Sequence, residues 1–374
     1  MQTLNPEELR RYARHLALPE FGRAGQEKAR SSSVLVVGAG GLGSPMLLYL
    51  AAAGIGKIGI IDFDRVDETN LQRQILYTME DIGQPKAATA RLKLLALNPH
   101  LEVEVYDEQL TSENALPIIS GYDIVADGTD NFPTRYLVND ACVLAGKVNV
   151  YASIFRFEGQ VSVFNHLQED GSRGPNYRDL FPTPPPPELV PNCAEGGVLG
   201  VLPGIIGSMQ ATEVIKVAAG IGEPLSGKLF LFDALTFTSR ILKVRKNPNL
   251  VIEQLIDYEQ FCAPQPQPAV PQLGVKELKK LMDEEADFQL IDVREPYEYA
   301  IANLGGELIP PSQISRQAGR ISRDKKVVLH CRSGKRSADA IRELQKLDSF
   351  DNLYNLEGGI LAWAQEIDPD MMQY

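Results

Sequence analysis

The sequence predicts an α/β protein with two domains, the first a doubly wound, mostly parallel sheet and the second a smaller α/β domain. Two observations lead to this prediction. Short β-branched runs alternate with helical segments in both halves of the chain. A proline-rich stretch separates the halves, and 374 residues are enough for two to three domains.

The uncharged stretch from Val34 to Gly56 admits two interpretations. Its length would allow it to cross a bilayer. However, glycines and a proline crowd its first half, and they would break a lipid-exposed helix and leave backbone groups unpaired. A strand Val34–Val37, a glycine turn and a helix Ser44–Ala53 explain it better, and a second strand, Lys57–Asp62, completes a βαβ unit.

The alternation continues along the first half and supports the doubly wound prediction. Residues 171–191, with four contiguous prolines, and the glycine-rich residues 196–200 then predict a long loop that covers a site or moves. The expected elements before this loop are a helix Pro85–Leu97, strands Glu102–Tyr106 and Ile124–Asp127, a helix Phe132–Ala145 and a strand Glu158–Phe164.

The stretch Ala263–Gln272 contains four prolines and no charge, which predicts an extended, semi-rigid linker. It separates an expected domain at residues 1–262 from another at residues 273–374. In the second domain we expect strands at Phe288–Val293 and Lys326–His330 and a helix at Ser337–Leu347.

Composition narrows the possible partners and compartments. The 37 basic and 49 acidic residues give a net charge of −12, which argues against binding to nucleic acid or to an acidic membrane surface. We therefore expect small-molecule and protein partners. The four cysteines form no Cys-x-x-Cys pair and the N-terminus has no apolar core, so we expect a reducing, cytoplasmic location.

The glycine turn predicts a Rossmann-like nucleotide site. Gly38, Gly40 and Gly43 fit the pattern G-x-G-x-x-G, directly after a strand and at the start of a helix whose amides can face phosphate. Asp62 ends the next strand, where a carboxylate can bind ribose hydroxyls. These features alone suggest NAD, and the alternative is simply a tight strand-to-helix turn.

The residues after Asp62 favour polyphosphate over NAD. The run from Asp64 to Gln74 is rich in groups that contact phosphate, and Lys86 stands in the first turn of the next expected helix. Asp130 and Asn131 follow a strand, where a carboxylate can hold Mg²⁺ over phosphates. Each of these residues could instead be a surface pair or a helix cap, but their combination in this order indicates a site for polyphosphate rather than a dehydrogenase.

Five segments of the first half closely resemble the MoeB/ThiF family, which is related to ubiquitin-activating enzymes. They are GAGGLGSP, IIDFDRVDETNLQRQ, IGQPKA, DGTDNFPTRYLVND and SIFRFEGQVSVF. The resemblance implies that the enzyme adenylates the C-terminal glycine of a ubiquitin-like sulfur carrier of the MoaD/ThiS type and releases pyrophosphate. It also implies a homodimer, because an arginine in the position of Arg14 reaches the phosphates of the partner subunit.

The resemblance also implies a role for each matching residue. Gly41 lies under the nucleotide, Asp62 binds the ribose, Asn70, Arg73 and Lys86 contact the phosphates, Asp130 places Mg²⁺, and Gln74 and Asn131 belong to the same site. Arg73, Lys86 and the metal at Asp130 would stabilise the charge that builds on the phosphate oxygens as the carrier carboxylate attacks.

In the second half, Cys331 follows a β-branched strand and precedes a helix. A turn there gathers N–H groups around the sulfur, and the basic residues of the loop favour a thiolate. The loop consists of Cys331, Arg332, Ser333, Gly334, Lys335 and Arg336. The alternative is a buried structural cysteine, while His330 is expected to pack at the end of the strand rather than act as a base.

Two chemistries use such a loop. A cysteine phosphatase has an arginine at the sixth position after the cysteine, but here Ser337 stands there and Arg336 comes one position earlier. With Asp292-Val293-Arg294-Glu295 before the loop and Glu357-Gly358-Gly359 after it, residues 273–374 resemble a rhodanese domain.

The rhodanese resemblance implies that Cys331 carries a persulfide, received from a donor such as a cysteine desulfurase or thiosulfate. The two halves together resemble MoeZ-like proteins, in which the product is a carrier thiocarboxylate. Cys193 occupies a segment where the family has a cysteine that attacks the adenylate or accepts sulfur, with loop packing as the alternative. Cys142 and Cys262 are expected to be structural.

Two other functions stay open from sequence: an NAD-dependent oxidoreductase fused to a rhodanese, and a rhodanese with a regulatory nucleotide-binding scaffold. The family commonly has two cysteine pairs that bind structural zinc. Residues 176–179 and 246–250 stand in their places without a cysteine, so we expect no zinc, although Asp179 and His166 could imitate a weak site. We then expect Pro184–Pro187 and dimer packing to hold the loop.

Overall fold

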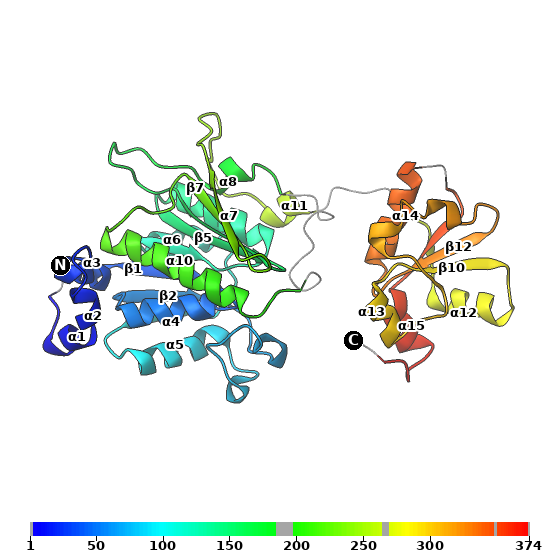
Figure 1. Ribbon diagram of the computed structural model, residues 1–374, viewed down its shortest axis with the longest axis horizontal. Coiled ribbons are helices and arrows are strands. Elements are labelled where there is room, and N and C mark those ends of the chain that lie inside the picture. Colours follow the sequence, from blue (N-terminus) through cyan, green and yellow to red (C-terminus); the bar gives the residue numbers. More distant parts are fainter. Residues whose placement is uncertain (1–2, 185–196, 264–268, 348–349, 373–374) are drawn as a thin grey trace. The chain divides into compact units, whose positions relative to one another are not determined.

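The computed structural model describes residues 3–184, 197–263, 269–347 and 350–372. The chain forms two compact units, Met1–Pro264 and Gln265–Tyr374 (Figure 1). Part of the expected linker lies outside the described residues, and its last residue already belongs to strand β9 (Gln272–Leu273) of the second unit. Within the described ranges, no helix is long and apolar enough to cross a membrane.

The first unit is built on an eight-stranded sheet with the order β3-β2-β1-β4-β5-β6-β7-β8. The first five of these strands in chain order run parallel, and the last three join them antiparallel. The strands are β1 (Ser33–Val37), β2 (Lys57–Ile61), β3 (Glu102–Tyr106), β4 (Ile124–Asp127), β5 (Val148–Phe155), β6 (Glu158–Phe164), β7 (Lys228–Asp233) and β8 (Thr238–Lys243).

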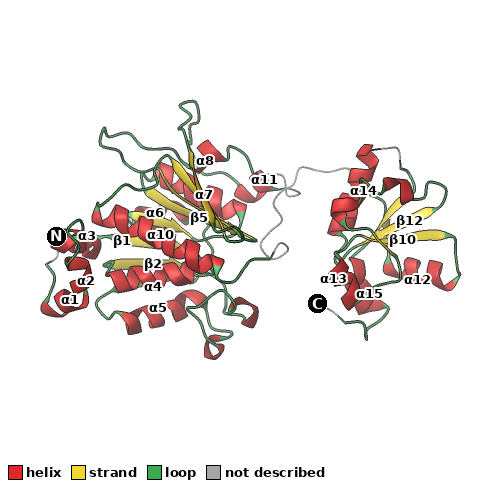
Figure 2. Cartoon of the chain, in the orientation of Figure 1, coloured by secondary structure: helices red, strands yellow, loops and turns green. Residues whose placement is uncertain are grey.

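Helices cover both faces of this sheet, as Figures 1 and 2 show. Val34 and Val36 of β1 belong to one apolar core with α4, α5 and α10, whereas Leu35 and Val37 belong to another with α6, α7 and α11. The described helices of the unit are α1 (Pro6–Arg11), α2 (Ala13–Leu16), α3 (Gly22–Ser31), α4 (Gly43–Ala53), α5 (Lys86–Leu97), α6 (Ala115–Ser120), α7 (Phe132–Leu144), α8 (Tyr177–Leu180), α10 (Leu202–Ala219) and α11 (Tyr258–Cys262).

The second unit has a five-stranded parallel sheet with the order β11-β10-β12-β13-β9. Apolar clusters pack on its two faces. Its elements are β9, α12 (Val275–Asp283), β10 (Phe288–Asp292), α13 (Pro296–Ile301), β11 (Glu307–Leu308), β12 (Lys326–His330), α14 (Lys335–Leu347), β13 (Leu353–Leu356) and α15 (Gly359–Glu366). Short 3₁₀ turns lie at Glu68–Asn70, Met79–Asp81, Pro311–Gln313 and Ala318–Arg320.

The predicted α/β fold class is confirmed, and the expected strands and helices occur within a few residues of their expected positions. The antiparallel direction of β6, β7 and β8 was not predicted, and neither were the strands β5, β7 and β8 or the long helix α10. The expected loop over residues 171–191 contains the one-turn helix α8, which begins at an Asn176 cap.

Candidate functional site

A cavity opens at the carboxyl ends of β1, β2 and β4, and the side chains that line it include Asp62 and Arg73. The order of the strands reverses between β1 and β4, because β2 and β3 lie on one side of β1 and β4 and β5 on the other. In doubly wound sheets such a switch point is where ligands bind. The fold therefore places most of the predicted nucleotide residues at the expected edge of the sheet.

The glycine turn closes the floor of this cavity. Gly38 has a φ of +90°, a conformation that glycine tolerates, and its N–H donates to Ile61 O at 2.9 Å. A Cβ at Gly43 would lie 2.1 Å from Gly38 O, so no larger residue fits without opening the turn. Gly40 and Gly41 line the cavity, where the absence of side chains lets a ligand approach the backbone.

Asp62 is tied directly to the glycine turn. Its Oδ2 accepts the Ala39 N–H at 2.7 Å and its Oδ1 accepts the Asp64 N–H at 2.9 Å. Burial raises the pKa of Asp62, and nearby Lys86 acts in the opposite direction. A carboxylate fixed in this way keeps lone pairs for the hydroxyls of a ligand.

Two cationic side chains line the same cavity. The Lys86 side chain is buried, and its Nζ lies 2.8 Å from Asp64 Oδ2. The Arg73 guanidinium donates to Thr69 O at 3.1 Å. Neighbouring Gln74 is buried, and its Oε1 has no hydrogen-bond partner among the described residues, so it is an acceptor that a ligand could satisfy.

Two carboxylates follow β4 with different environments. Asp127 is fully buried, burial raises its pKa, and its Oδ2 lacks a partner among the described side chains and backbone groups. Asp130 is exposed at the cavity, and Asn131 caps α7 by accepting the Thr134 N–H at 2.9 Å. Because Mg²⁺ binds through one or two carboxylates together with substrate phosphates, this donor set fits the ion.

Three predicted residues do not line the cavity: Gly43, Asn70 and Arg14. Asn70 ends a 3₁₀ turn and its side chain accepts the Asp67 N–H at 3.4 Å. Arg14 is exposed on α2. Its expected role requires a second subunit, so it stays a prediction.

The cavity also contains residues that sequence reasoning did not assign, among them Phe63, Thr129 and Arg135. The Arg135 guanidinium is buried, donates to Thr129 O at 3.0 Å, and lies 5.9 Å from the centre of the Tyr151 ring. Thr129 and Arg135 both belong to the segment DGTDNFPTR. The sequence does not show that Arg135 is buried, contacts Thr129 O and lies beside the Tyr151 ring of β5.

In the second unit, Cys331 lies at the carboxyl end of β12 and its side chain is buried. Its Sγ accepts the Gly334 N–H at 3.2 Å and contacts Ser337 Oγ at 3.4 Å. Gly334 has a φ of +90°, which lets the loop curl around the sulfur. The predicted turn around the Cys331 sulfur is therefore present.

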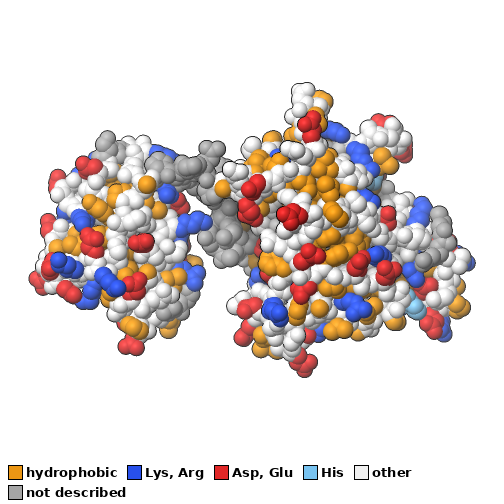
Figure 3. All heavy atoms as spheres, turned by 180° about the vertical axis from the view of Figure 1, so that it is seen from behind, with side chains coloured by type: hydrophobic (Ala, Val, Ile, Leu, Met, Phe, Trp, Pro, Cys, Tyr) orange, Lys and Arg blue, Asp and Glu red, His pale blue; other side chains and the backbone are white. Residues whose placement is uncertain are grey.

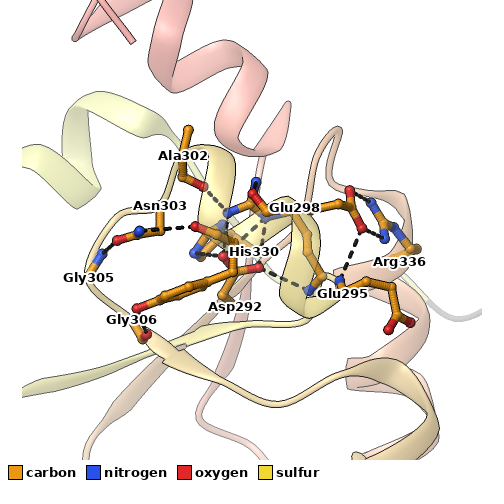
Figure 4. Close-up of polar contacts among 11 residues, drawn as sticks. Asp292, Glu295, Glu298, Ala302, Asn303, Gly305, Gly306, His330 and Arg336 are labelled. Atoms are coloured by element: carbon orange, nitrogen blue, oxygen red, sulfur yellow. Dashed lines mark hydrogen bonds and ion pairs between the residues drawn. The ribbon is translucent and has the colours of Figure 1, made fainter. Parts of the chain in front are cut away.

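Figure 4 shows the polar contacts around Arg336, the last residue of the loop, and His330, which directly precedes the loop in sequence. Arg336 forms two hydrogen bonds to Glu298, at 2.6 and 2.7 Å. His330 is fully buried, and burial lowers its pKa to about 4. Its Nε2 lies 3.6 Å from Asp292 Oδ2, which is too long for a hydrogen bond, so a neutral His330 packs in the core rather than serving as a base.

The segment that stands in place of the family's first cysteine pair is held by polar contacts. Arg178 donates twice to buried Asp140, at 2.8 and 2.7 Å, and Asp179 Oδ1 accepts the Asn247 N–H at 2.8 Å. Within the described ranges, no group of three or more metal-ligating side chains occurs.

Of the other three cysteines, Cys142 and Cys262 lie among the described residues. Burial raises the pKa of the Cys142 thiol well above its ordinary value, and it raises that of Cys262 to about 11. Cys193 lies outside the described residues.

Comparisons with known proteins cover both units. The chain matches the ThiF family over residues 12–252 and the rhodanese-like domain over residues 274–366. It is 48% identical to a Mycobacterium tuberculosis protein named probable adenylyltransferase/sulfurtransferase MoeZ, over 99% of this chain and 96% of that protein. It is 42% identical to the mouse adenylyltransferase and sulfurtransferase MOCS3, over 99% and 88% of the two chains.

The chain is 55% identical to the Thermus thermophilus sulfur carrier protein adenylyltransferase, over 68% of this chain and 97% of that protein. The solved structure of Escherichia coli MccB with ATP has a TM-score of 0.55 and 22% identity, over 66% of this chain and 75% of that one, which shows the shared fold. These relatives do not support the oxidoreductase alternative. The chain belongs to the ThiF family, carries a rhodanese-like domain after it, and is an adenylyltransferase and sulfurtransferase.

Proposed function

We propose that the first unit adenylates the C-terminal glycine of a ubiquitin-like sulfur carrier with ATP. The observation that carries the proposal is the meeting of Arg73, Lys86 and Asp62 around a glycine turn at the switch point of the sheet. A site for hydride transfer has no need of cations beside the phosphates, whereas attack on an α-phosphate builds charge that cations stabilise.

The residues divide the work of adenylation between binding and charge stabilisation. Asp62 accepts hydrogen bonds from the ribose hydroxyls. The backbone N–H groups of the glycine turn and of the start of α4 face the phosphates. Arg73 and Lys86 hold the phosphate oxygens as the carrier carboxylate bonds to the α-phosphorus and pyrophosphate leaves. Mg²⁺, held by Asp130, would neutralise further charge on the phosphates.

We propose that the second unit supplies the sulfur through a persulfide on Cys331. The terminal sulfur of the persulfide bonds to the carbonyl carbon of the adenylated glycine and AMP leaves, which gives an acyl disulfide. A thiol, for which Cys193 is the candidate within this chain, then cleaves that disulfide. The carrier leaves as a thiocarboxylate, and Cys331 remains in a disulfide with the attacking thiol. A reducing thiol then returns Cys331 to its free thiol form.

A reducing, cytoplasmic setting and a homodimer complete the proposal. The second reaction consumes thiols, which suits a reducing compartment. Figure 3 shows a broad patch of hydrophobic side chains on one face of the first unit, a feature typical of protein interfaces. In the proposed dimer, the exposed Arg14 of one protomer would contribute to the phosphate site of the other.

Carrier-dependent exchange of pyrophosphate into ATP tests the adenylation step. We expect exchange only with carriers that end in Gly-Gly, and Arg73→Ala should slow it by about 10²-fold or more because it removes transition-state charge stabilisation. Arg91→Ala is the matched control, since Arg91 is exposed on α5 outside the cavity lining. Exchange without any carrier, or hydride transfer with NAD, would contradict the proposal.

A further inference from the structure

The loop around Cys331 contains three basic residues, and the structure shows a carboxylate partner for Arg336. Arg332, Lys335 and Arg336 all belong to the loop. The Arg336 guanidinium donates hydrogen bonds to both carboxylate oxygens of Glu298, at 2.6 and 2.7 Å. A bidentate ion pair of this kind neutralises the guanidinium charge locally and fixes the orientation of the arginine side chain.

Glu298 is held in place independently of Arg336. Its side chain is about one-twentieth exposed, at 5%, and its Oε2 also accepts the Glu295 N–H at 3.1 Å, which caps α13. Arg294 is fully buried and holds the same helix through hydrogen bonds to two backbone oxygens. It donates to Glu298 O and, at 2.7 Å, to Ala302 O. The carboxylate is therefore a fixed part of the unit, and Arg336 is drawn to it (Figure 4).

The pair matters because sulfur donors differ in charge. In each case Cys331 sulfur bonds to the donor's sulfane sulfur as the donor's S–S bond breaks. The electron pair leaves on sulfite when the donor is thiosulfate, a dianion, and on a thiolate when the donor is a persulfide, which carries one charge at the reacting sulfur. An Arg336 guanidinium without its carboxylate partner would attract the dianion more strongly than the monoanion, and the Glu298 carboxylate cancels that attraction.

We propose that the Glu298–Arg336 pair makes the Cys331 loop select a singly charged persulfide donor over doubly charged thiosulfate. The proposal rests on the proposed sulfur transfer through Cys331 and names Glu298 as a specificity-determining residue. In this proposal Glu298 acts through the charge of Arg336.

The test compares sulfur loading of Cys331 in the full chain, measured by mass spectrometry, with thiosulfate and with cysteine persulfide as donors. Glu298→Gln keeps the size of the side chain and an oxygen for the Glu295 N–H, but it removes the charge. We expect kcat/KM for thiosulfate to rise about tenfold or more, chiefly through KM, while the value for cysteine persulfide changes less than about threefold. The gain should shrink as salt is added, because screening weakens the freed cation.

Two further variants keep the result interpretable. Glu366→Gln removes one carboxylate from the same unit at an exposed pair with Lys276, and it should leave the ratio of the two donors unchanged. The double variant Glu298→Gln with Arg336→Gln removes the freed cation as well, so its donor ratio should return to that of the wild type.

Several results would overturn the inference. Equal changes with both donors, a salt-independent gain, or a double variant that keeps the gain would show that Glu298 acts only by holding the loop. Fluorescence of Trp363, the single tryptophan, reports whether the second unit of each variant is folded. If wild-type Cys331 took sulfur from neither donor, the sulfur transfer itself would be refuted, whereas loading of the wild type with an unchanged donor ratio in Glu298→Gln refutes only the selectivity.

Discussion

Replacing Arg178 by methionine tests whether an ion pair holds the segment after β6 in the absence of zinc cysteines. The Asp140 side chain is 1% exposed and receives hydrogen bonds from Arg178, from Tyr258 Oη at 2.8 Å and from Asn139 Nδ2 at 3.0 Å. Arg178→Met leaves this buried carboxylate without its cation. Methionine still packs against the Phe261 ring, whose centre lies 4.6 Å from the Arg178 guanidinium carbon.

The structure sets the size of the effect. Removing one partner of a buried ion pair lowers the free energy of unfolding by about 3–5 kcal/mol. Because two other hydrogen bonds to Asp140 remain, we expect a loss of about 3 kcal/mol, at the lower end of this range. Such a loss is a large part of the free energy of unfolding of a domain, about 5–15 kcal/mol. The double variant Arg178→Met with Asp140→Asn removes both charges, so it should be more stable than Arg178→Met alone by about 1 kcal/mol or more.

Equilibrium unfolding in urea measures this loss in the full chain. Circular dichroism follows both units, whereas the fluorescence of Trp363 in α15 follows only the second, so its transition serves as an internal control. Arg178→Met should shift the first unit's transition and leave the fluorescence transition in place. A loss below about 1 kcal/mol, or a double variant as unstable as the sum of the two single ones, would refute the role of the pair.

Three further predictions follow. Cys331→Ala should abolish sulfur loading but keep pyrophosphate exchange, whereas Cys262→Ala should change neither; loss of exchange in Cys331→Ala would show that the two reactions are coupled. Because burial lowers the pKa of His330 from 6.5 to about 4, the unfolded second unit binds the proton first as the pH falls. Its stability should thus drop by about 2 kcal/mol between about pH 7 and pH 5, with the drop abolished in His330→Gln; an equal drop in that variant would contradict this origin. Elemental analysis of chelator-washed protein should find no zinc, and one zinc per chain would overturn the prediction.

Much of the candidate site could be predicted because its residues stand in local patterns. Gly38 and Gly43 belong to one turn, and Asp62 ends the strand beside it, so a short stretch of chain brings them together. Cys331 is likewise placed by the turn between β12 and α14. In each case hydrogen bonds between near neighbours in sequence determine the geometry.

The partners of the charged groups could not be predicted in the same way. Lys86 meets Asp64, and Arg336 meets Glu298, across segments that are distant in sequence. The sequence indicates a cation in each position, but it does not indicate whether a carboxylate already neutralises it. That depends on which loops the sheet brings to the same edge.

The sequence by itself determined the two α/β units, the glycine turn and the loop around Cys331, because hydrophobic period, glycine conformation and turn chemistry are local properties. Only the tertiary structure decided the antiparallel strands β7 and β8, the burial of Arg135 in the wall of the cavity and the pairing of Glu298 with Arg336. These features depend on pairing between distant segments, whose free energy is gained only when the whole sheet has formed.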